Sequence, residues 1–126
     1  MRNLVRASVL LLALGLSEPV LAGPLEDARA AYDKQDYTTA LRLLRPLAAQ
    51  GDADAQFHLG VMYQVGQGVP QDYVEAHKWF NLSAARTSVD EEYVREAVKN
   101  RNHVAEGMTP AQIAEAQKRA SAWRPK

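Results

Sequence analysis

The stretch that decides the fold is GDADAQFHLGVMYQVGQGVPQDYVEAHKWFNLSAA, residues 51–85. It predicts two short helices joined by a glycine-rich turn. Asp52 suits the N-cap of the first helix because its carboxylate can accept the unpaired N–H groups of the first turn. The polar Gln56 narrows the apolar stripe of that helix at its start. The stripe recurs every fourth residue and consists of Ala55, Leu59 and Tyr63.

The second helix of this unit is marked by clear start and stop signals. The run Gly66-Gln67-Gly68 should end the first helix, since glycine adopts the left-handed conformation without steric cost. Asp72 then begins the second helix, with Glu75 three residues later as an acidic variant of the capping box. The aromatic pair Trp79 and Phe80 is expected to be core, because it lies in an apolar stripe with helical spacing: Ala76, Trp79, Phe80, Ser83 and Ala84.

The second half of the unit has an earlier counterpart, shifted by 36 residues. Asp36, Tyr37, Ala40, Leu43, Leu44, Leu47, Ala48 and Ala49 align in order with Asp72, Tyr73, Ala76, Trp79, Phe80, Ser83, Ala84 and Ala85. A fixed period in the thirties indicates a helical solenoid, in which each helical hairpin buries its apolar face against a neighbour.

These residues resemble the Sel-one-like repeat, a relative of the tetratricopeptide repeat. The pattern A-x-A-x-x-x-L-G-x-x-Y-x-x-G-x-G-V-x-x-D-x-x-x-A-x-x-W-x-x-x-S-A-A is carried by Ala53, Ala55, Leu59, Gly60, Tyr63, Gly66, Gly68, Val69, Asp72, Ala76, Trp79, Ser83, Ala84 and Ala85. Ser83 is a mild departure, because the family usually has alanine there. The resemblance is specific over 51–85 and partial over 24–50. It implies an all-α, α/α solenoid of antiparallel helical hairpins that contacts other proteins, generally without chemistry of its own.

We therefore expect residues 23–126 to form one helical-repeat domain of about six helices. It would comprise a partial first hairpin (23–50), a full repeat (51–85) and a C-terminal capping hairpin (86–126). The last pair does not keep the 36-residue register, and it could instead be a binding hairpin. Further expectations are a kink or early loosening at Pro46, and capping boxes that pair Ser88 with Glu91 and Thr109 with Gln112.

The N-terminus has the order of residues found in a secretory signal peptide. Arg2 and Arg6 precede an apolar run at 7–16, and Val20-Leu21-Ala22 supplies the compact residues of a cleavage site. That run is shorter than the roughly 20 residues that span a bilayer as a helix. We expect a signal peptide at 1–22, cleavage after Ala22, and a periplasmic or secreted protein without a stable membrane span. No disulfide is possible, since the chain has no cysteine.

Composition and spacing give little support to catalysis, to cofactor or metal binding, or to nucleic-acid binding. Basic and acidic residues are equal in number, 15 each, so charge gives no case for nucleic acid. The three histidines His58, His77 and His103 lack the helical spacing of a metal site and are expected on the surface or partly buried. No nucleophile elbow surrounds a serine, and the turn at 66–68 lacks the strand and lysine of a phosphate loop.

A second face of the first helix in 51–85 is the candidate partner surface. It consists of Phe57, Val61 and Gln64, which point away from Ala55, Leu59 and Tyr63. This face either packs on the preceding hairpin or is open to a protein partner. The favoured function is a non-enzymatic adaptor of the bacterial envelope, with an unknown partner and oligomeric state. The alternatives are an exported hydrolase of the repeat class and a module that binds cell-wall glycan.

Overall fold

The computed structural model describes residues 23–85 and 91–126. The expected signal peptide at 1–22 and the capping box of Ser88 with Glu91 lie outside the described residues. Within the described ranges the chain forms six helices and no strand. They are α2 (Pro24–Asp33), α3 (Tyr37–Gln50), α4 (Ala53–Val65), α5 (Tyr73–Ala84), α6 (Glu91–Ala105) and α7 (Pro110–Ala122). The all-α prediction is confirmed.

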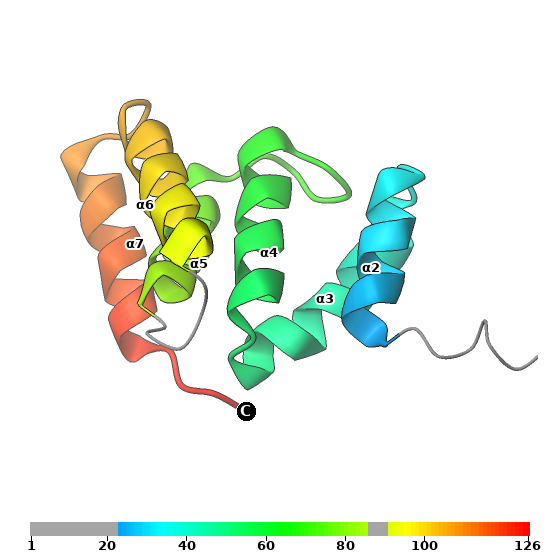
Figure 1. The fold of residues 1–126 in the computed structure, drawn as a ribbon. Coiled ribbons are helices and arrows are strands. Elements are labelled where there is room, and N and C mark those ends of the chain that lie inside the picture. The colour runs from blue at the N-terminus through cyan, green and yellow to red at the C-terminus, as the bar shows by residue number, and fades with distance from the viewer. Residues whose placement is uncertain (1–22, 86–90) are drawn as a thin grey trace, which may run out of the picture.

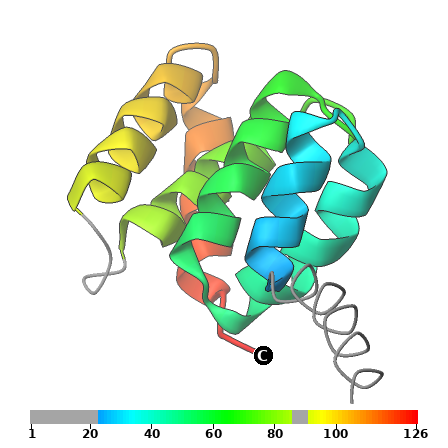
Figure 2. The same cartoon turned by 45° about the vertical axis from the view of Figure 1, so that its right-hand side comes forward.

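From α2 to α6 each helix packs on the next one in the chain, as expected for a solenoid. Figure 1 shows α2, α4 and α6 next to one another in one layer, with α3 and α5 running behind them. Figure 2 shows the same order from another side, with α4 between α2 and α6. Both α6 and α7 pack more closely on α5 than on each other. The last two helices therefore pack mainly on α5, and α6 also contacts α4.

The helix starts predicted from N-cap residues are confirmed wherever the N-cap lies in the described part of the chain. The carboxylate of Asp52 accepts a hydrogen bond from the Ala55 N–H at 2.9 Å, and that of Asp72 accepts from the Glu75 N–H at 3.1 Å. Thr109 and Gln112 form the full reciprocal capping box. The predicted acidic capping box does not form, because the Glu75 carboxylate pairs instead with Lys78 and with Arg119 of α7.

Proline inside α3 does not end that helix early. α3 continues through Pro46 to Gln50, and Pro46 is exposed. At an exposed position water can satisfy the backbone carbonyl that loses its intrahelical partner. The early loosening expected from the sequence is therefore not found.

Helix α4 separates two apolar clusters, which we name the first core and the second core. The first core lies between α2, α3 and α4, and its buried members are Ala28, Ala31, Ala40, Leu41, Leu44, Ala48, Ala55, Leu59 and Met62. The second core lies between α4, α5 and α6. Its buried members are Ala76, Phe80 and Val104, packed against half-buried side chains that include Phe57, Val61 and Tyr73.

The aromatic pair of α5 is divided between these two cores. Phe80 is fully buried in the second core, and half-buried Trp79 packs against the first. Gly60 of α4 makes room for Phe80, because a Cβ built at Gly60 would lie 2.6 Å from the Phe80 ring. The core prediction is confirmed for Phe80, whereas Trp79 lies at the margin of its cluster.

Two polar side chains are buried where helices meet. The amide of Gln56 donates to the Ala48 carbonyl of α3 at 3.1 Å. The hydroxyl of Ser83 donates to the Ala53 carbonyl at 2.8 Å and so links α5 to α4. Gln56 therefore extends the buried face of α4 instead of narrowing it. The serine at the usual alanine position gains a hydrogen bond between two helices.

Candidate functional site

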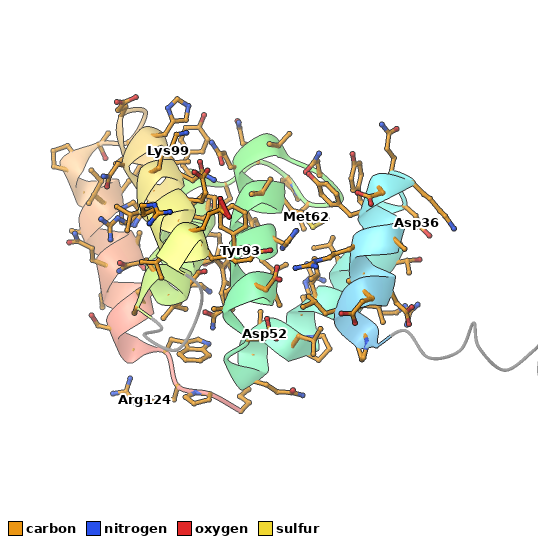
Figure 3. The ribbon with its side chains drawn as sticks, viewed as in Figure 1. Asp36, Asp52, Met62, Tyr93, Lys99 and Arg124 are labelled. Carbon is orange, nitrogen blue, oxygen red and sulfur yellow. The ribbon has the colours of Figure 1, made fainter. Side chains whose placement is uncertain are left out.

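Three side chains from α2, α4 and α6 meet in one polar cluster, which we name the cross-helix cluster. The guanidinium of Arg29 on α2 pairs with the carboxylate of Asp54 on α4. It also donates to the Tyr93 hydroxyl of α6 at 3.0 Å, and that hydroxyl donates to Asp54 Oδ2 at 3.1 Å. Figure 3 shows Tyr93 between α6 and α4. The cluster joins one helix from each of the three helical pairs.

His58 adds a fourth member one turn along α4. Its Nδ1 lies 2.9 Å from the backbone carbonyl of Asp54 and 2.8 Å from the carboxylate oxygen Oδ1. The second contact is an ion pair when the ring is protonated. His58 also contacts aromatic rings on both sides, with centroid distances of 6.3 Å to Tyr32 and 5.8 Å to Phe57. The expectation that His58 is partly buried is confirmed.

Electrostatics hold the cluster in a charged, bonded state at neutral pH. Burial opposes ionisation of Asp54, but the contacts with His58 and the charge of Arg29 lower its pKa below the ordinary value. Burial and the Asp54 charge together raise the pKa of the Tyr93 hydroxyl. Asp54 therefore stays ionised and Tyr93 stays protonated. This arrangement suits an electrostatic link between helices, because the Asp54 carboxylate, a strong acceptor, faces donors from both α2 and α6.

A shallow hollow lies beside the cluster, between α4 and α6. Its volume is about 210 Å³, and its lining residues are Phe57, Glu92, Tyr93 and Glu96. The Phe57 and Tyr93 rings meet edge to face, with centroids 5.7 Å apart. Since small-molecule sites usually enclose about 300–1,000 Å³, the hollow is nearer in size to a pocket for one side chain.

The predicted partner residues divide between the second core and the end of α4. Phe57 and Val61 are half-buried against the second core, and Phe57 also lines the hollow. Gln64 lies near the end of the helix, where its carbonyl accepts a hydrogen bond from the Gln71 side chain at 2.9 Å. The prediction that this face packs on the preceding hairpin is wrong, because the side of α4 that faces that hairpin carries Ala55 and Leu59. Whether Phe57, Val61 and Gln64 contact a partner stays a prediction.

The other two histidines differ sharply in burial. His77 of α5 is only 4% exposed, so the expected surface or partly buried position is wrong for this residue. Burial lowers its pKa, and the charge of Arg101 acts in the same direction. His103 is exposed near Glu106, with 3.4 Å between Nδ1 and Oε1. In the described part of the chain, no three His, Cys, Asp or Glu side chains come together in a metal-binding group.

Sequence reasoning missed the cross-helix cluster. Arg29, Asp54 and Tyr93 are far apart in the chain, and none belongs to the repeat pattern. One signal was available: Tyr93 follows Phe57 by 36 residues, the period of the repeat. Although the last pair as a whole does not keep the register, this one spacing places Tyr93 on α6 where Phe57 lies on α4, two helices earlier.

Comparisons with known proteins identify the repeats. A family model described as Sel1 repeat matches residues 29–52 and 53–88. An uncharacterized Sel1-like repeat-containing protein of Schizosaccharomyces pombe is 38% identical over 63 residues, which are 50% of this chain and 9% of that protein. The chain thus spans less than a tenth of the length of this relative. A comparison with solved structures gives no significant match.

Proposed function

Because the chain is a Sel1-like repeat protein, we propose that it is a protein-binding adaptor of the bacterial envelope. Its binding surface would be the layer formed by α2, α4 and α6, which we name the three-helix face. Sel1 repeats are helical scaffolds for protein interaction, and helical solenoids present extended surfaces to their partners. The partner and its place in the envelope are parts of this proposal.

One observation carries the choice of the three-helix face: the cross-helix cluster ties all three of its helices together. The Asp54 carboxylate pairs with Arg29 of one neighbouring helix and accepts a hydrogen bond from Tyr93 of the other. A surface fixed in this way loses less conformational entropy when it binds. The hollow at Phe57 lies on the same face and offers a pocket for a partner side chain.

Site-specific photo-crosslinking in intact cells tests this surface. A photo-reactive amino acid replaces Val65, the large apolar residue that ends α4 and is 57% exposed. The matched control carries the same amino acid at the exposed Lys118 of α7. We expect one discrete protein adduct from position 65 and none from position 118. Equal adducts from both positions, or none from position 65, would contradict the assignment of this face.

The envelope location is tested on the processed protein. We propose that a signal peptide is removed after Ala22, on the basis of Arg2, Arg6 and the apolar run at 7–16. N-terminal sequencing of the protein from envelope fractions should begin at Gly23. A protein that retains Met1 or fractionates with the cytoplasm would refute this part. In the described residues, none of the helices has the length and apolar character needed to cross a membrane.

The same material tests the alternative functions. Retention on purified cell wall without a protein adduct from position 65 would favour a glycan-binding module. Turnover in a hydrolase screen, absent from a mock purification, would favour an enzyme. We place the adaptor first because residues 29–52 and 53–88 match the Sel1 repeat, a helical scaffold for protein interaction.

A further inference from the structure

The hollow between α4 and α6 has an aromatic wall and an acidic rim. Phe57 and Tyr93 supply the rings, and Glu92 and Glu96 supply carboxylates one helical turn apart. The Tyr93 hydroxyl is bonded to Arg29 and Asp54. The polar end of Tyr93 is therefore engaged in the cross-helix cluster, and its ring remains as a wall of the hollow. Two of the four lining residues, Glu92 and Glu96, carry carboxylates.

This combination of residues fits a cation with an extended apolar stem. A cation near the face of an aromatic ring is attracted by the ring quadrupole. Carboxylates at the rim add charge-assisted hydrogen bonds. The methylene groups of a long basic side chain can lie along the rings while its charged end reaches the rim. A volume of about 210 Å³ suits one such side chain rather than a larger organic ligand.

We propose that the hollow receives an arginine side chain from the protein partner. This inference rests on the proposed function, because it assigns a specificity pocket to the three-helix face. Arginine is favoured over lysine for two reasons. Its planar guanidinium stacks on aromatic rings, and its donors form a fork that can serve two carboxylates. Lysine offers a compact, strongly hydrated charge without these two properties.

The direct test uses the arginine side chain alone as the probe. N-acetyl-arginine N-methylamide is titrated into the ¹⁵N-labelled protein, followed by amide chemical shifts. The lysine and norleucine analogues serve as ligand controls. We expect saturable shifts at Phe57 and Tyr93 with the arginine probe, weaker binding of the lysine probe, and no saturation with norleucine. Equal shifts with all three probes, or none with arginine, would overturn the proposal.

A matched pair of double variants separates the rim from general electrostatics. Glu92→Gln with Glu96→Gln removes the rim charges, whereas Glu106→Gln with Glu115→Gln makes the same change in net charge outside α2, α4 and α6. We expect the rim variant to bind the arginine probe about tenfold more weakly, since hydrogen bonds to charged groups are worth that much. The control variant should bind as the original protein does. Equal losses in both variants would overturn the rim assignment.

The crosslink from position 65 separates this inference from the proposed function. Loss of the adduct in the rim variant, with retention in the control variant, supports both. An adduct that persists in the rim variant overturns the arginine pocket and leaves the adaptor function intact. Arginine-probe binding without any protein adduct overturns the adaptor function and, with it, a partner arginine. An adduct that proves to be a second copy of this chain also overturns a separate protein partner.

Discussion

The two sides of α4 meet different kinds of core. On one side Ala55, Leu59 and Met62 are buried in the first core, whose buried members are aliphatic and whose margin carries half-buried aromatic side chains such as Trp79. On the other side Phe57 is half-buried against the second core, and the aromatic contacts continue outward to Tyr93 and the hollow. The second core reaches the surface at Phe57, and the hollow that is the candidate binding site lies there.

The largest expected effect is a loss of stability that separates the two aromatic residues of α5, the buried Phe80 and the half-buried Trp79. Phe80→Ala should lower the free energy of unfolding by about 3–5 kcal/mol, through lost transfer energy and an unfilled cavity. Trp79→Ala should cost less, because Trp79 is half-buried and packs at the margin of the first core. Urea denaturation of both variants measures the difference. A larger loss for Trp79→Ala would reverse the assigned roles of the two residues.

The next effect tests how tightly the second core fits. Gly60→Ala places a methyl group against the Phe80 ring, at a Cβ position only 2.6 Å from it. We expect a loss of about 1–3 kcal/mol from overpacking. Phe80→Leu in the Gly60→Ala background should cost less than Phe80→Leu alone, because a smaller side chain relieves the clash. A double-mutant cycle measures this coupling. Strictly additive losses would show that Gly60 and Phe80 do not share this space.

The order and ends of the helices follow from local sequence signals. Asp52, Asp72 and Thr109 each cap a helix as predicted, since a side-chain oxygen can reach the N–H groups of its own first turn. The left-handed Gly66 likewise ends α4 where the sequence predicts. These features depend on residues within a few positions of one another, so one sequence suffices to predict them.

Contacts between helices depend on how the helices are rotated and spaced relative to one another, and a short sequence motif does not predict this. Gln56 was interpreted as a polar interruption, but the Ala48 carbonyl of α3 provides its amide with a buried acceptor. The hydrogen bond of Ser83 to Ala53 is hidden in the same way, 30 residues apart in the chain. The cross-helix cluster follows this rule too. Its members are polar residues whose partners become visible only when the helices are packed.

A smaller effect tests the buried serine between α4 and α5. Ser83→Ala restores the residue usual in the family and removes the hydrogen bond to Ala53. We expect a loss of about 1 kcal/mol, the typical net value of such a bond. The control is Ser121→Ala at an exposed site of α7, with an expected change within about 0.5 kcal/mol. Thermal and urea unfolding measure both. Increased stability of Ser83→Ala would mean that packing there outweighs the bond.

The smallest effect concerns pH and the contact between His58 and Asp54. Burial tends to lower the pKa of His58, but the hydrogen bonds and charge of Asp54 raise it above the ordinary value of 6.5. A raised folded-state pKa means that protonated His58 stabilises the fold. This contribution is fully present below pH 6.5 and is lost as pH rises through the folded-state pKa. The Asp54 pKa is lowered from 3.8, so its contribution is lost only at more acidic pH.

The stability gap between the original protein and His58→Gln should therefore be larger at pH 5 than at pH 8. The difference should be about 0.5–1 kcal/mol, as for a partly exposed ion pair. Urea denaturation at the two pH values measures the gap, and the exposed His103→Gln serves as the control. A gap that is equal at both pH values would show that the neutral ring supplies the whole contribution. The link between α2, α4 and α6 would then depend on Arg29 and Tyr93 as the partners of Asp54, without a charge on His58.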